Sequence, residues 1–344
     1  MIHTLEFYVN INPDEKVILE NLHRKGIKKI LRDLENSYKH FNLRIGKPLY
    51  NKSHNIYMQT DVIELLERDN GVITEEDYGL VQEHIIELEK ALFGMLGKKF
   101  TLNRIDYRLD LKVHSAEHRA TLFKLWGKLA NKYGHLNKRT KKKVFRGQNG
   151  KDVYIYSKQF KTTIYIASKA LVVCLYDKEA ERIAKKEPVK NYEKDVIRFE
   201  IRLMPRHLAY KARSNKINRS LKAYFDAPVY DFYIKKYVLD IFGVGHFYKI
   251  NKVRELLSIT NLTAREQEKV ITFLKDISRR GMEGAIGYRN NKKNGYSRYL
   301  IRKYKTLLDE LGINMILLPV RVRNTGDRLT NPLNGIHKAC QNVA

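Results

Sequence analysis

Cysteine and long apolar runs are scarce in this chain of 344 residues. Its two cysteines, Cys174 and Cys340, lie far apart, which excludes a disulfide scaffold and a cysteine-rich zinc site and suits a reducing compartment. No apolar run approaches the length of a membrane-spanning helix, and residues 1–6 lack the charged and apolar regions of a signal peptide. We therefore expect a cytoplasmic protein without a membrane partner.

Two motifs common among enzymes that act on nucleic acids are also missing. None of the 11 histidines forms a His-x-His pair, so the paired-histidine metal motif of many DNA-nicking enzymes is excluded. Glycine precedes lysine in residues 94–98 and 147–151, but the spacing is not that of a Walker A loop. We therefore expect no intrinsic helicase or ATPase activity.

Acidic residues are outnumbered, because 38 Asp and Glu face 66 Lys and Arg, which gives a formal net charge of +28. Such a chain repels itself when folded unless a polyanion neutralises it, and nucleic acid is the usual polyanion. An anionic membrane surface is the alternative, but no basic amphipathic terminal helix accompanies the charge. Residues 131–151 hold eight basic residues and no acidic one, and 279–305 hold nine against one, with tyrosines interleaved. The candidate DNA-binding residues are Lys141, Lys142, Lys143, Arg146, Arg206, Arg298 and Arg302.

Hydrophobic periodicity predicts an α+β fold. Apolar and charged side chains alternate through residues 103–114, the pattern of a strand with one buried face and one charged, wet face, and 197–203 alternates in the same way. We also expect a strand over 2–11, one helix from residue 12 towards 41, and a three-stranded meander over 152–176. Helical patterns prevail beyond about residue 210. The predicted parts are an antiparallel sheet domain with flanking helices over 1–210, a smaller, mostly helical basic domain over 211–318, and a basic tail over 319–344.

Carboxylates stand out on the charged faces of two predicted strands. Asp106 and Asp110 share one face of the strand over 103–114, and Glu200 lies between two arginines on the strand over 197–203. Carboxylates brought together on neighbouring strands can hold Mg²⁺ or Mn²⁺, and such an ion polarises a phosphodiester. The alternative is that they form surface ion pairs with the adjacent arginines, and spacing alone favours this alternative.

Tyr176 ends an apolar run where a strand gives way to a helix. A phenol has a pKa near 10, so it becomes a useful nucleophile only when a cation or base helps it lose its proton. Lys178 could do this if the backbone is still extended there. The alternative is an ordinary tyrosine at a strand end, and Tyr154, Tyr156 and Tyr165 lie in the same predicted meander.

Three short blocks carry a resemblance to a known family. They are Arg104-Ile105-Asp106, Tyr176-x-Lys178-x-x-Glu181, and Val196-Ile197-Arg198-Phe199-Glu200-Ile201-Arg202. In this order, the blocks resemble the replication initiators of the filamentous-phage gene II/X type, which are found on phages and plasmids. A looser likeness exists to the initiators and relaxases of Gram-positive rolling-circle plasmids.

The resemblance implies a site-specific nickase that starts rolling-circle replication, with its chemistry in residues 1–210. Tyr176 would attack a DNA phosphate and form a 5′-phosphotyrosyl bond, which frees a 3′-hydroxyl for a host polymerase. Asp106 and Glu200 would hold Mg²⁺ or Mn²⁺, and Lys178 and Glu181 would support the tyrosine. This assignment reverses the preference for surface ion pairs.

The strand face that holds Asp106 suggests further metal ligands, and the resemblance suggests partners. Asp110 and His114 lie on the face of Asp106 and are candidate extra metal ligands, although the family motif does not require them, and the role of His3 is left open. The expected partners are origin DNA, as duplex or hairpin and as single strand, with a host helicase and polymerase, and a homodimer is left open. A conjugative or mobilisation relaxase with the same chemistry and a non-catalytic DNA-binding regulator are the alternative functions.

Overall fold

The computed structural model describes residues 1–130, 162–214, 216–285, 295–322 and 325–336, together with the backbone of three short strands within 131–161. The strands are β1 Ile2–Ile11, β2 Phe41–Ile45, β3 His54–Asp61, β4 Thr101–Lys112, β5 Asn137–Lys138, β6 Lys141–Arg146, β7 Asp152–Tyr156, β8 Thr163–Ala167, β9 Leu171–Asp177, β10 Val196–Leu203, β11 Phe247–Tyr248 and β12 Arg328–Leu329. The α-helices are α1 Pro13–His23, α2 Ile27–Ser37, α3 Val62–Leu65, α4 Tyr78–Phe93, α5 Ala116–Leu129, α6 Lys178–Lys185, α7 Pro205–Arg213, α8 Leu221–Phe225, α9 Ala227–Ile234, α10 Asp240–Phe242, α11 Ile250–Ser258, α12 Ala264–Ala285 and α13 Arg298–Glu310. Short 3₁₀ turns occur at Gly94–Leu96 and Asn191–Glu193, and a π-helical turn at Lys235–Leu239.

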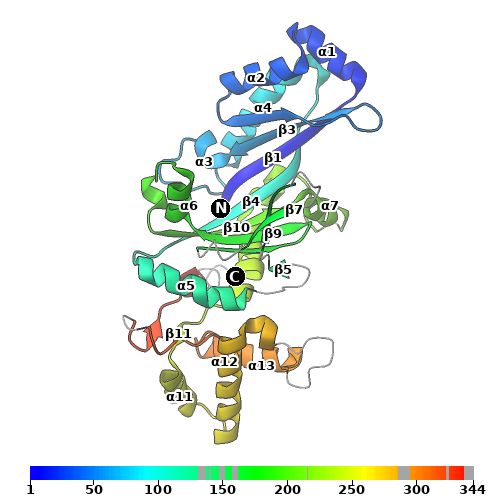
Figure 1. The fold of residues 1–344 in the computed structure, drawn as a ribbon. Coiled ribbons are helices and arrows are strands. Elements are labelled where there is room, and N and C mark those ends of the chain that lie inside the picture. Colours follow the sequence, from blue (N-terminus) through cyan, green and yellow to red (C-terminus); the bar gives the residue numbers. More distant parts are fainter. Residues whose placement is uncertain are drawn as a thin grey trace. The chain divides into compact units, whose positions relative to one another are not determined.

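The main sheet is antiparallel and has eight strands in the order β2-β3-β1-β4-β10-β9-β8-β5, with helices flanking it (Figure 1). The predicted α+β class is therefore confirmed. The predicted meander is wrong in its first strand, because β7 pairs with β6 in a separate two-stranded sheet, whereas β8 and β9 belong to the main sheet.

The chain divides into two compact units. Unit 1 comprises Met1–Leu109, Lys169–Val172 and Glu200–Phe232, and unit 2 comprises Asp110–Ser168, Val173–Phe199 and Tyr233–Ala344. The segments of these units alternate along the sequence. The division at residue 210 that the sequence suggested stays a prediction.

In unit 1, the segment after β1 forms two helices rather than the single predicted helix. Asn12 begins α1 with a capping box, in which its side chain accepts from the amide of Glu15 and the Glu15 carboxylate accepts from the amide of Asn12. α1 ends where Arg24 adopts a left-handed conformation with φ of 50°. Arginine carries no sequence sign of such a break, because glycine is the usual residue there. The prediction of one helix is therefore wrong at this point.

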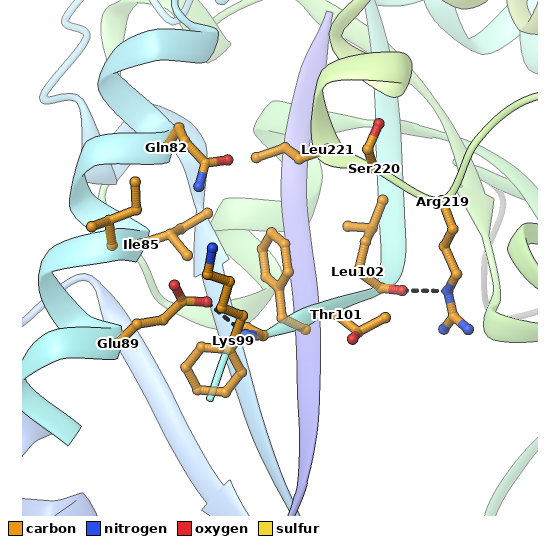
Figure 2. A pocket seen from close by; sticks show the side chains of 12 residues that line it. Gln82, Ile85, Glu89, Lys99, Thr101, Leu102, Arg219, Ser220 and Leu221 are labelled. Atoms are coloured by element: carbon orange, nitrogen blue, oxygen red, sulfur yellow. Dashed lines mark hydrogen bonds between the residues drawn. The ribbon is translucent and has the colours of Figure 1, made fainter. Parts of the chain in front are cut away.

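One face of the sheet in unit 1 is apolar and packs on α4. Phe7 of β1 lies opposite Leu102 of β4, and both line a cavity of about 250 Å³ together with Ile85 of α4 (Figure 2). Leu5 and its partner Ile105 are fully buried on the same face. The opposite face of these strands carries the polar residues.

The core of unit 2 includes a group of three aromatic side chains. Trp126 of α5 meets Phe199 of β10 edge-on at 5.4 Å between ring centroids, and Phe242 of α10 lies 5.4 Å from Phe199. All three side chains are fully buried. Edge-to-face packing of aromatic rings adds to the gain from burial.

Candidate functional site

A β-bulge in β1 lies at His3. Ile2 pairs with Tyr107 and Thr4 pairs with Asp106, so His3 is an extra residue between two consecutive partners on β4. Bulges of this kind re-aim a side chain and are common beside active sites. The ring Nδ1 of His3 lies 3.2 Å from the hydroxyl of Thr4. The sequence left the role of His3 open, and the bulge explains how it joins the polar face of the sheet.

Four side chains gather on this polar face, and we call them the carboxylate cluster: His3, Asp61, Asp106 and Glu200. Thr4 pairs with Asp61 on one side and with Asp106 on the other, so both acids project from the same face. Nε2 of His3 lies 3.1 Å from Oδ2 of Asp61, and Nδ1 lies 3.7 Å from Oε1 of Glu200. The cluster thus joins residues from β1, β3, β4 and β10.

The two predicted acids of the cluster are buried. Asp106 is 1% exposed and Glu200 is 2% exposed, although the alternating pattern suggested a wet face. Arg104 Nε donates to Oδ1 of Asp106 at 2.7 Å, and Arg202 Nη2 donates to Oε2 of Glu200 at 2.7 Å. Arg202 also lies 3.5 Å from Asp106, so it bridges the acids. The expectation of a solvated charged face is wrong here, because arginines rather than water neutralise the acids.

Burial and mutual charge shift the protonation of these acids. Burial raises the pKa of Asp106 above its ordinary value, and the nearby Glu200 charge adds to the rise, although Arg104 and Arg202 oppose it. Asp61 differs: burial raises its pKa, but the hydrogen bond and charge of His3 outweigh burial and lower the pKa to about 2. Arg202 contacts both Asp106 and Glu200, at 3.5 and 2.7 Å, so the two carboxylates lie close together.

The cluster has the donor chemistry for a divalent cation. Carboxylate oxygens suit Mg²⁺ and Mn²⁺, and the imidazole of His3 is an added donor that Mn²⁺ accepts. Within the described ranges, however, no three histidine, cysteine or acidic side chains converge as they do around a metal ion. In this structure Arg104 and Arg202 pair with the carboxylate oxygens of Asp106 and Glu200, so binding of a cation there stays a prediction.

Tyr176 is half-buried near the end of β9 in unit 2. The next residue, Asp177, begins α6 by accepting from the amide of Ala180 at 3.0 Å, and it also accepts from Arg119 Nε at 2.9 Å. Hydrogen bonds from the α6 backbone and from Arg119 of α5 therefore fix Asp177 at the junction between β9 and α6. Tyr176 is not packed in the interior, which would have excluded it as a nucleophile.

Lys178 is the first residue of α6 and is 4% exposed. Its ammonium donates to Glu181 at 2.8 Å, lies 3.6 Å from Glu193, and is 5.9 Å from the centre of the Tyr176 ring. Burial raises the pKa of Glu181, but the hydrogen bonds from Lys178 and Lys185 outweigh it, so the pKa is lowered. The predicted Tyr-x-Lys-x-x-Glu block thus brings its three side chains together. The supporting role of Lys178 and Glu181 stays a prediction, and Glu193 is a member that no sequence pattern indicated.

The two suggested extra metal ligands each have another partner in unit 2. Asp110 accepts from Arg198 at 2.8 and 2.9 Å, and Arg198 is 1% exposed. His114 is exposed and lies 3.3 Å from Asp195. Metal ligation by either residue stays a prediction, and the bidentate bond to Arg198 gives Asp110 a structural role.

The predicted DNA-binding residues divide into two groups. Arg206 is exposed at the start of α7, and Arg298 and Arg302 are exposed on α13. The other four lie on β6, whose side chains fall outside the described part of the chain: Lys141, Lys142, Lys143 and Arg146. Contact with DNA stays a prediction for both groups.

Comparisons with known proteins do not assign this chain to a family. No family model and no curated protein matches this chain. Among the described helices, none is both long and apolar enough to cross a bilayer. The site therefore has to be interpreted from its own chemistry.

Proposed function

We propose that the protein is a metal-dependent DNA nickase that starts rolling-circle replication in the cytoplasm. The carboxylate cluster carries the proposal, because two buried acids from neighbouring strands and a histidine re-aimed by a bulge lie on one face of a sheet. The net charge of +28 supports DNA as the substrate.

The nucleophile in this proposal is the Tyr176 hydroxyl. Its oxygen bonds to the phosphorus of one phosphodiester, and the bond from phosphorus to the 3′ oxygen breaks. The phenolic proton is lost, the 3′ oxygen gains a proton, and a 5′-phosphotyrosyl bond remains. The Lys178 ammonium, 5.9 Å from the ring centre, favours the phenolate that attacks. Because the covalent bond conserves the phosphodiester energy, the reverse attack by a 3′-hydroxyl rejoins the strand without ATP.

Asp106, Glu200 and His3 would hold Mg²⁺ or Mn²⁺ in this proposal. Such an ion supplies charge stabilisation at the phosphate. Arg104 and Arg202, which neutralise the acids in this structure, would be free to contact phosphate oxygens when the cation takes over that task. A host helicase and polymerase would open the duplex and extend the 3′-hydroxyl.

Two other functions compete with this proposal. A conjugative or mobilisation relaxase would use the same residues at a transfer origin. A non-catalytic DNA-binding regulator is favoured by a specific observation, namely that arginines already satisfy Asp106 and Glu200 as ion pairs. Only the first alternative shares covalent chemistry, so an adduct assay separates the regulator from both nickases.

The test uses Tyr176→Phe with Tyr165→Phe as the matched control, since Tyr165 is also half-buried on a strand of unit 2. Each protein is incubated with Mn²⁺ and a random-sequence single-stranded DNA pool, and protein-linked DNA is separated on a denaturing gel. We expect adducts from the wild type and from Tyr165→Phe, and none from Tyr176→Phe despite intact DNA binding. Wild-type protein that binds the pool but forms no adduct supports the regulator, and adducts from Tyr176→Phe refute the assigned nucleophile.

A further inference from the structure

The loop between β2 and β3 presents a tyrosine to solvent from an ordered turn. The Lys52 amide donates to the Leu49 carbonyl at 2.9 Å, and the Leu49 amide donates to the Ser53 carbonyl at 2.8 Å. Ser53 is 1% exposed, and Asn10 of β1 donates to its hydroxyl at 3.2 Å. These bonds hold the base of the loop against β1. Tyr50, between the bonded residues, is therefore exposed on a hydrogen-bonded turn at the end of the β2–β3 hairpin, and β2 is the edge strand of the sheet.

The exposure of this loop is large for apolar side chains. Tyr50 has a relative exposure of 107% and Leu49 one of 46%. Because the Tyr50 ring and the Leu49 side chain are left in water, the fold gains no hydrophobic stabilisation from them. An aromatic ring at the tip of a loop also does not improve solubility. An aromatic side chain in this position suits a partner with flat, stackable groups.

Charge complementarity indicates which partner that is. Residues 41–60, which cover β2, the loop and β3 up to its last residue but one, contain Arg44, Lys47 and Lys52 and no acidic residue. β3 then ends at Asp61 of the carboxylate cluster. All three cations are exposed. An exposed aromatic ring among cations is the arrangement with which proteins bind single-stranded nucleic acid, since rings stack on bases and cations contact phosphates.

The polar face of the sheet connects this hairpin with the carboxylate cluster within unit 1. Tyr57 of β3 lies opposite both Tyr8 of β1 and Arg44 of β2, and the Arg44 guanidinium stacks 4.2 Å from the centre of the Tyr57 ring. Gln59, two residues further towards Asp61, is exposed on the same face. At about 3.3 Å per residue, the path from residue 55 to Asp61 is about 20 Å long. The β3 side chains along it are polar and at least partly exposed, and Glu6 of β1, which pairs with Gln59, lies on the same face with its carboxylate 3.1 Å from Arg44.

We infer that Tyr50 stacks on an unpaired base of single-stranded DNA and that the hairpin guides the strand along the polar face towards the carboxylate cluster. The inference rests on the proposed function for the identity of the nucleic acid. It goes further by assigning a base contact to a loop that carries no part of the family resemblance.

The test compares Tyr50→Ala with Tyr50→Phe, both made in the Tyr176→Phe protein so that no cleavage intervenes. The probes are a fluorescent single-stranded oligonucleotide of about 20 thymidines and a duplex of the same length, measured by anisotropy. Loss of one stacked base weakens binding about tenfold, so we expect that loss for Tyr50→Ala on the single strand. Tyr50→Phe keeps the ring and should stay within about twofold, and duplex affinity should change by less than about twofold.

The outcomes separate this inference from the proposed function. If Tyr50→Ala binds the single strand as tightly as the protein with Tyr50, the stacking role is overturned, whatever the result of the adduct assay. Equal loss on single strand and duplex also overturns it, because a contact to phosphates alone would produce that result. A missing adduct with the random pool overturns the nickase but leaves the binding comparison intact. Unchanged thermal unfolding of both variants shows that the exposed substitution leaves the fold intact.

Discussion

Asp106→Asn and Asp110→Asn make the same chemical change on the same strand, four residues apart. The sequence made both residues candidate metal ligands. In the structure, Asp106 belongs to the carboxylate cluster, whereas Asp110 is tied to the buried Arg198. We predict that Mn²⁺ stabilises the wild type and Asp110→Asn, and that it does not stabilise Asp106→Asn.

The two variants are distinguished by the stability that Mn²⁺ adds to each, and not by their stability without metal. Asp106→Asn weakens charge-assisted hydrogen bonds from Arg104 worth about 1.5–3 kcal/mol each, but it also relieves burial of a charge and repulsion from Glu200. Asp110→Asn leaves Arg198 with a neutral partner, which is also destabilising. The change in stability without metal therefore does not distinguish the two variants. At a Mn²⁺ concentration of about one hundred times Kd, a cation that binds only the folded protein adds about 2.7 kcal/mol.

The assay is thermal unfolding with Mn²⁺ and with a chelator, together with calorimetric titration of Mn²⁺. An increment of about 2.7 kcal/mol corresponds to a rise in Tm of roughly 4 °C, and we expect it for the wild type and for Asp110→Asn. An equal increment in Asp106→Asn would refute the assignment of the cluster as the metal site. The same conclusion would follow if the wild type showed no increment and no heat of binding at millimolar Mn²⁺.

Two further predictions concern unit 2. Burial raises the pKa of Glu193, but hydrogen bonds from Arg182 and the charge of Lys178 outweigh it, so the pKa is lowered. This acid therefore stabilises the fold above its unfolded pKa of about 4.3, and the contribution fades as pH falls below that value. Glu193→Gln should accordingly reduce the free energy of unfolding most at pH 7 and least near pH 3, as measured by urea unfolding. The same reduction relative to the wild type at both pH values would contradict the assignment. Gly245→Ala would bring a Cβ within 2.6 Å of the backbone oxygen of Ile313, so we expect a loss of about 1–3 kcal/mol or more, and a wild-type Tm would contradict it.

Much of the fold follows from period-two alternation in the sequence. The strands expected over 2–11, 103–114 and 197–203 correspond to β1, β4 and β10. Alternation is informative here because one face of each strand is apolar. The pairing of β7 with β6 was not predictable in this way, since alternation within a strand does not identify its neighbour.

The acids of the cluster were partly predictable from the sequence. Asp106 and Glu200 occupy polar positions of strongly alternating strands, and this pattern placed them on charged faces. Asp61 was missed, because it is the last residue of β3 and also begins α3 as its N-cap. His3 joins the cluster through a bulge that depends on the pairing of β1 with β4. A bulge is a property of two strands together, so neither strand alone reveals it.

The burial of Asp106 and Glu200 is itself an argument for chemistry. Buried ion pairs such as Arg202 with Glu200 are often no more stabilising than apolar side chains of similar volume. The apolar face of these strands already supplies a core through Leu5 and Ile105, and a face needed only for solubility would keep its charges in water. Neither stability nor solubility therefore accounts for acids that are 1% and 2% exposed and repel each other. Carboxylates are the ligands that divalent cations prefer and arginines pair with phosphates, and both interactions are stronger out of water.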